Sequence, residues 1–144
     1  MANRKVESVS FLILSLFIIN IFGCATLKEK MKGLAGVSTK ILEDNRYDAI
    51  SKNFDFDYAG AYKRVKEALS SMGTYVYSED KKNDLIAVYI SETDTTVVGI
   101  FLTEIEGSKV KVEVSSPSTY GKETISKRLF AILEGLPDPA LRME

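Results

Sequence analysis

Four segments rich in β-branched and aromatic residues follow one another between residues 74 and 115, and they restrict the fold more than any other feature. They read TYVYSE, LIAVYIS, TVVGIFLTEIE and KVKVEVS. The stretches between them, EDKKND, SETDT and EGS, have the polar, turn-prone composition of hairpin loops. The pattern predicts four strands that pair mainly antiparallel in chain order.

Alternation of apolar and polar residues marks two of the predicted strands. In the last one, three valines alternate with three charged residues, which predicts one buried and one solvated face: Val110, Val112 and Val114 against Lys109, Lys111 and Glu113. An earlier strand is predicted over residues 50–58, where the apolar positions are Ile50, Phe54, Phe56 and Tyr58. Asp55 and Asp57 then lie together on its solvated face.

Two amphipathic helices are predicted on either side of the four strands. The first carries apolar residues at spacings of three and four, with Asp57 as N-cap and Gly73 as the residue after its end: Tyr58, Tyr62, Val65, Leu69 and Met72. The second runs from about Tyr120 to Glu134 and buries Ile125, Leu129, Ile132 and Leu133. A short helical turn capped by Ser38 is expected before the first strand. The order β-α-β-β-β-β-α predicts a single small α+β domain, a mainly antiparallel sheet with both helices on one face.

The first 23 residues have the three parts of a secretory signal peptide. Arg4 and Lys5 form a positive start, an apolar stretch follows, and Gly23 is the small residue before the expected cut. Ser15 and Asn20 interrupt the apolar stretch, which is shorter than the roughly 20 residues that cross a bilayer as a helix. This pattern predicts a leader that is cleaved after residue 23.

The segment Ile21-Phe22-Gly23-Cys24 resembles the lipobox of bacterial lipoproteins, although Ile21 and Phe22 differ from its commonest residues. The resemblance implies that signal peptidase II cuts before Cys24, that the Cys24 sulfur carries diacylglycerol, and that the new amino group is acylated. Several acyl chains hold a protein on a membrane stably. Because Ala25 replaces the Asp that usually signals retention at the inner membrane, the resemblance also implies the outer membrane, facing the periplasm.

The chain is therefore expected to have four parts. These are a signal peptide over 1–23, a lipidated cysteine with a flexible tether over 24–37, the α+β domain over 38–137 and a C-terminal tail over 138–144. The segments SETDTTVVGIF and EVSSPSTYGKE are similar to those of small uncharacterised bacterial lipoproteins with one α+β domain. A weaker similarity is to the helix-grip modules of lipoproteins that accompany outer-membrane assembly machinery, and neither similarity implies a catalytic motif.

Composition argues against most catalytic chemistry. The chain has no histidine and a single cysteine, so it lacks the commonest general base, and its thiol is expected to carry lipid. We expect no enzymatic activity, no cofactor and no metal. The net charge of −1 also predicts no nucleic-acid partner, which would require a basic surface. The alternative is a small periplasmic hydrolase using carboxylates such as Asp55 and Asp57, or Ser-Lys chemistry; the S-x-x-K spacing of Ser78 and Lys81 is interpreted as part of a turn.

One candidate binding surface follows from the strand order. If the strands form a meander, the loops 91–96 and 115–120 meet at one end of the sheet. They form a hydroxyl-rich surface, the polar rim, which contains Asp94, Thr95, Thr96, Ser118, Thr119 and Tyr120. Such groups can hydrogen-bond a glycan or the backbone of an envelope protein. In the alternative interpretation the Thr and Asp residues only form turns and Ser118 only caps a helix. The sequence thus predicts a lipid-anchored, non-catalytic interaction or structural module, whose partners are the membrane, through its lipid, and an envelope protein or glycan.

Overall fold

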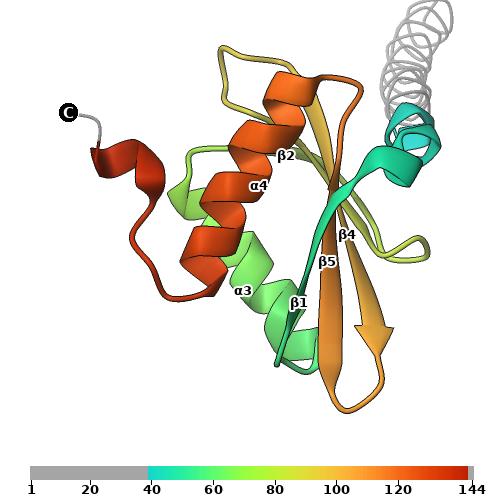
Figure 1. Cartoon of the computed structure of the whole chain (residues 1–144). Coiled ribbons are helices and arrows are strands. Elements are labelled where there is room, and N and C mark those ends of the chain that lie inside the picture. Colours follow the sequence, from blue (N-terminus) through green and yellow to red (C-terminus); the bar gives the residue numbers. More distant parts are fainter. Residues whose placement is uncertain (1–38, 143–144) are drawn as a thin grey trace, which may run out of the picture. The chain divides into compact units, whose positions relative to one another are not determined.

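A five-stranded antiparallel sheet forms the centre of the computed structural model, which describes residues 39–142 (Figure 1). The strands are β1 (Ile50–Phe54), β2 (Tyr75–Asp80), β3 (Leu85–Tyr89), β4 (Val97–Ile105) and β5 (Lys109–Ser115). Two helices complete the domain, α3 (Tyr58–Ser71) and α4 (Thr119–Leu133). The predicted α+β class and the order β-α-β-β-β-β-α are confirmed.

The sheet is a meander to which the first strand has been added at one side. Strands β2 to β5 pair with their chain neighbours, and β1 pairs with β5, which gives the order β1-β5-β4-β3-β2. The short loops between strands make this antiparallel pairing the natural outcome. The two edge strands of the sheet are therefore β1, in which Ile50 pairs with Val114 of β5, and β2, in which Tyr75 pairs with Tyr89 of β3.

Helices α3 and α4 cover one face of the sheet, as predicted (Figure 1). Leu69 of α3 and Leu129 of α4 are fully buried against that face, whereas Tyr58, Tyr62 and Ile132 of the same apolar stripes are partly buried. Both predicted N-caps are confirmed: the Asp57 carboxylate accepts a hydrogen bond from the amide of Gly60 at 2.9 Å, and the Ser118 hydroxyl accepts one from the amide of Gly121 at 3.2 Å. These caps determine the residue at which each helix begins.

The opposite face is partly covered by residues 39–48, the N-terminal strap, which contains a short helix over 39–44 and the 3-10 turn η1 (Arg46–Asp48). Leu42 is completely buried there. A Cβ added at Gly99 would lie only 3.1 Å from the Cβ of Leu42, so the absence of a side chain at Gly99 gives Leu42 its space. The prediction of a wholly solvated face on β5 was wrong, because Glu113 is only 8% exposed beneath the strap. Ser38, the expected cap of this segment, lies outside the described residues.

The first strand ends earlier than its alternation suggested. It stops at Phe54, and Asp57 leaves the strand pattern to cap α3. Asp55 is exposed and forms an ion pair with Lys109 Nζ at 3.2 Å. The two carboxylates expected on one strand face therefore belong to different local structures.

The segment predicted as a tail from residue 138 is attached to the domain. It contains the 3-10 turn η2 (Pro139–Arg142), and the buried carboxylate of Asp138 accepts hydrogen bonds from Arg128 Nε at 3.0 Å and Nη2 at 2.5 Å. Arg128 also donates to the backbone oxygen of Met72 at 3.1 Å. One arginine thus joins the end of α3, the middle of α4 and the C-terminal segment.

Candidate functional site

The two loops of the polar rim lie at the same end of the sheet and touch each other. The hydroxyl of Ser116 donates to the backbone oxygen of Val97 at 2.6 Å. A Cβ added at Gly121 would come within 2.8 Å of the Thr96 methyl carbon, so the first turn of α4 packs closely on the start of β4. The meander therefore brings together the residues that the sequence placed in the rim.

Several rim side chains already have structural partners. The Asp94 carboxylate accepts a hydrogen bond from the amide of Thr96 at 3.0 Å, and hydrogen bonds from Thr96 lower the pKa of Asp94. Ser118 is occupied as the cap of α4. Thr95, Thr119 and Tyr120 are exposed, with Tyr120 at 62%. The turn and cap roles are thus present, and a binding role for the rim stays a prediction.

A buried lysine lies one turn into α4 behind the rim. Lys122 is 6% exposed, and its amine donates to the backbone oxygen of Asp48 at 2.7 Å and pairs with the Asp48 carboxylate. The nearby hydroxyls of Ser115 and Ser116 donate to backbone oxygens. The amine and these hydroxyls therefore hold the strap and the loop in place.

The spacing Ser78-x-x-Lys81, interpreted from sequence as part of a turn, spans a strand and a turn. Ser78 belongs to β2, and the turn begins only at Lys81. Within the described residues 39–142, His, Cys, Asp and Glu side chains form no group of three or more that could hold a metal ion. Several of the described carboxylates are engaged in caps, turns and ion pairs, such as the pair of Lys66 with Glu79 at 2.7 Å.

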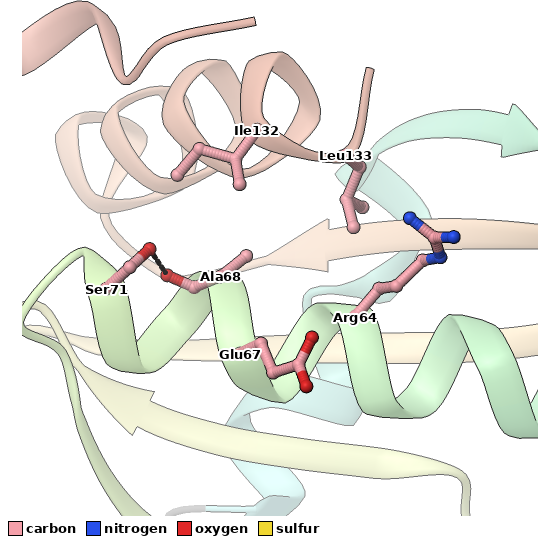
Figure 2. A pocket seen from close by; sticks show the side chains of 6 residues that line it. All are labelled: Arg64, Glu67, Ala68, Ser71, Ile132 and Leu133. Atoms are coloured by element: carbon pink, nitrogen blue, oxygen red, sulfur yellow. Dashed lines mark hydrogen bonds between the residues drawn. The ribbon is translucent and has the colours of Figure 1, made fainter. Parts of the chain in front are cut away.

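A groove of about 280 Å³ separates the C-terminal halves of α3 and α4 (Figure 2). It is lined by Arg64, Glu67, Ala68, Ser71, Ile132 and Leu133. The Arg64 guanidinium lies 4.6 Å from the centre of the Phe56 ring, and the Ser71 hydroxyl donates to the backbone oxygen of Ala68 at 2.8 Å. The polar groups of the groove are thus directed to neighbouring parts of the domain, and its floor is formed by aliphatic side chains.

A second cavity, of about 530 Å³, lies beside the strap on the other face of the sheet. It is lined by Glu43, Arg46, Lys82, Asn83, Asp84, Phe101 and Thr103. Arg46 donates to Glu113 at 2.5 Å and to the Thr103 hydroxyl at 3.0 Å, while its guanidinium lies 4.5 Å from the centre of the Phe101 ring. Asp84 accepts a hydrogen bond from the Tyr58 hydroxyl at 2.5 Å. Arg46 thus fastens the strap to the sheet, and Asp84 fastens the β2–β3 turn to α3.

Three tyrosines on the strap side of the sheet form a surface that the sequence analysis missed. The rings of Tyr75 and Tyr89 are stacked with centres 6.1 Å apart, and those of Tyr77 and Tyr89 with centres 4.4 Å apart. We call these three residues the tyrosine ladder. The signal was present in the hairpin TYVYSEDKKNDLIAVY, because a tight turn places its first and last tyrosines opposite each other.

Comparison with known proteins assigns the chain to no group. No protein-family model matches it, and no curated protein sequence matches it significantly. None of the helices within residues 39–142 has the length and apolar composition that a membrane crossing requires. Cys24 lies outside the described residues.

Proposed function

We propose that this protein is a lipid-anchored lipoprotein of the bacterial cell envelope whose domain acts as a non-catalytic interaction module. The observation that carries the proposal is the lone cysteine, Cys24, placed directly after an apolar leader in the sequence IFGC. A thiol at that position is suited to alkylation by diacylglycerol, and the acyl chains then supply the membrane affinity. The absence of Asp at residue 25 favours the outer membrane, facing the periplasm.

The described domain is consistent with a binding role. Its buried ionisable and hydroxyl groups are engaged in fold-stabilising contacts, as shown by Lys122 with Asp48, Arg128 with Asp138, and Ser115 with the backbone of Leu42. Its exposed features are surfaces: the polar rim, the groove between α3 and α4, and the tyrosine ladder. Such surfaces favour recognition of a partner over chemistry in an enclosed site.

Metabolic labelling tests the anchor. The full-length protein, expressed in a bacterial host with two membranes and fed labelled palmitate, is expected to incorporate label and to sediment with the outer-membrane fraction. A Cys24→Ser variant should incorporate no label and should retain the uncleaved leader. A matched Ser10→Ala variant, altered in the same leader outside the lipobox, should behave as the wild type. Equal labelling of wild type and Cys24→Ser would contradict the proposal.

A further inference from the structure

The tyrosine ladder presents aromatic surface to solvent at an edge of the sheet. Tyr75 lies on the edge strand β2 and is 51% exposed, and Tyr77 and Tyr89 are partly exposed. The interplanar angles, 10° for Tyr75 with Tyr89 and 20° for Tyr77 with Tyr89, show that the three rings are nearly parallel. Exposed and ordered aromatic rings are typical of recognition surfaces, since each offers apolar area at a low entropic cost.

Packing and strand pairing hold two residues of the ladder, Tyr77 and Tyr89, in place. Tyr77 lies at a bulge in β2 and packs against the buried cluster that contains Leu42 and Phe101. Tyr89 is paired on one side with Tyr75 and on the other with Val97. Rings fixed in this way lose little freedom when a ligand is bound, and this preorganisation favours affinity.

A loop rich in hydrogen-bonding groups follows directly on the ladder. Residues 91–96 connect Tyr89 and Ile90 to β4, and the loop is ordered by its own contacts: the Ser91 hydroxyl accepts from the amide of Asp94 at 2.9 Å, and Asp94 Oδ1 accepts from the amide of Thr96 at 3.0 Å. Thr93 and Thr95 are exposed. The tyrosine ladder is thus followed in the chain by an ordered loop of hydroxyl and carboxylate groups. Three of the loop residues, Asp94, Thr95 and Thr96, belong to the polar rim.

Charge narrows the class of ligand. The segments that form this surface, residues 74–80 and 89–97, contain no Lys or Arg, and the loop carries the carboxylates of Glu92 and Asp94. An anionic ligand would meet uncompensated negative charge here, which opposes binding. A neutral glycan combines the required features, because the C–H faces of a sugar ring are apolar and its hydroxyls both donate and accept hydrogen bonds.

We propose that the tyrosine ladder and the loop 91–96 together form a binding site for a neutral glycan. A sugar ring stacks on the exposed ring of Tyr75, and hydroxyls of the same or the adjoining sugar bond the Thr95 hydroxyl and the Asp94 carboxylate. The proposal rests on the proposed function, since it names the ligand class of the envelope interaction module.

Titration of the purified full-length protein in detergent tests the site. The probes are three neutral tetrasaccharides: tetra-N-acetylchitotetraose, cellotetraose and maltotetraose. At least one is expected to bind, and Tyr75→Ala is expected to weaken that binding roughly tenfold or more, as truncation of a central aromatic contact does. Tyr75→Trp should retain binding. Because the chain contains no tryptophan, the fluorescence of this variant also reports directly whether the sugar reaches residue 75.

The matched control is Tyr47→Ala, which removes another exposed tyrosine, at 89%, from the 3-10 turn η1 of the strap. It should leave the affinity unchanged, and circular dichroism should show that both alanine variants are folded. Binding of none of the three probes, or equal binding by wild type and Tyr75→Ala, would overturn the proposal. So would tighter binding of the anionic tetragalacturonate than of the neutral sugars.

This experiment is independent of the lipid. The Cys24→Ser variant, purified in the same detergent, is expected to bind the same neutral probe with the affinity of the wild type. Failure of palmitate labelling with intact sugar binding would contradict the proposed anchor alone. Normal labelling without sugar binding would contradict the glycan site alone.

Discussion

The ion pair between Glu113 and Arg46 is expected to stabilise the domain, and Glu113→Gln tests it. The Glu113 side chain is 11% exposed on β5, where Arg46 of the strap donates to it at 2.5 Å and Lys111 Nζ lies 3.3 Å away. Glutamine preserves the shape and one acceptor oxygen, but it removes the negative charge. The substitution therefore isolates the electrostatic part of the contact between strap and sheet.

The expected loss is set by the burial of the two partners. Hydrogen bonds to charged groups contribute roughly 1.5–3 kcal/mol. Since the Arg46 side chain is 38% exposed, water compensates for part of this, and we expect the free energy of unfolding to fall by about 1–2 kcal/mol. For a domain of this size, each kcal/mol lowers Tm by roughly 4–8 °C.

The effect should depend on pH with a defined sign. Burial alone raises the pKa of Glu113, but the hydrogen bonds and charges of Arg46 and Lys111 outweigh it and hold this pKa below its usual 4.5. A carboxyl group with a lowered pKa in the folded state stabilises the fold above its unfolded pKa. That contribution is then lost as the pH falls through the pKa that the group has in the folded state. The difference in the free energy of unfolding between wild type and Glu113→Gln should thus have its full size near neutral pH and become smaller below pH 4.5.

Urea unfolding followed by circular dichroism measures this difference at neutral pH and at several values below 4.5. The matched control is Asp55→Asn, which makes the same change of charge in a pair whose Asp55 side chain is 85% exposed. We expect it to change stability little, as exposed ion pairs generally do. Equal stabilities of the two variants, or a Glu113→Gln effect that does not diminish in acid, would refute the reasoning.

Three further predictions concern other contacts of the domain. Leu42→Ala should destabilise the domain by about 2–5 kcal/mol in urea unfolding, because it leaves a cavity between strap and sheet. Asp57→Ala should cost about 0.5–2 kcal/mol in the same assay, because the cap of α3 is lost. Burial, and then hydrogen bonds to Asp84 and Glu79, raise the pKa values of Tyr58 and Tyr62 to about 12. The stabilisation that the two tyrosines provide should therefore be complete below pH 10.0, their usual pKa, and should decline between pH 10.0 and about 12. Urea unfolding at a series of alkaline pH values measures this decline.

The fold could be predicted from the sequence because its main elements are locally encoded. The four strands were recognisable from their β-branched residues and polar loops, and both helices from their apolar spacing and caps at Asp57 and Ser118. The strap was underestimated because it is held by a few separate side chains, Leu42, Arg46 and Asp48. Their effect depends on residues more than 40 positions away along the chain, and no local periodicity reveals such contacts.

The candidate surfaces could be predicted only in part. The meander placed the two loops of the polar rim together, because antiparallel pairing fixes which loops share an end of the sheet. The tyrosine ladder requires the register of β2 with β3, including the irregularity between Val76 and Ser78. Composition alone does not specify a bulge, so the position of Tyr77 beside Tyr89 became visible only in the structure.

The strap and the tyrosine ladder share one buried cluster, and this links the stability of the domain to its proposed binding surface. Leu42 occupies the space above Gly99 near the start of β4, and the same buried cluster supports Tyr77 and Val97 at its margin. A side chain at Gly99 would meet Leu42 and Leu85 at 3.1 Å, so overpacking there would force the strap outward. The glycine thus lets the strap pack closely on part of this face, while the rings of the tyrosine ladder stay in contact with solvent.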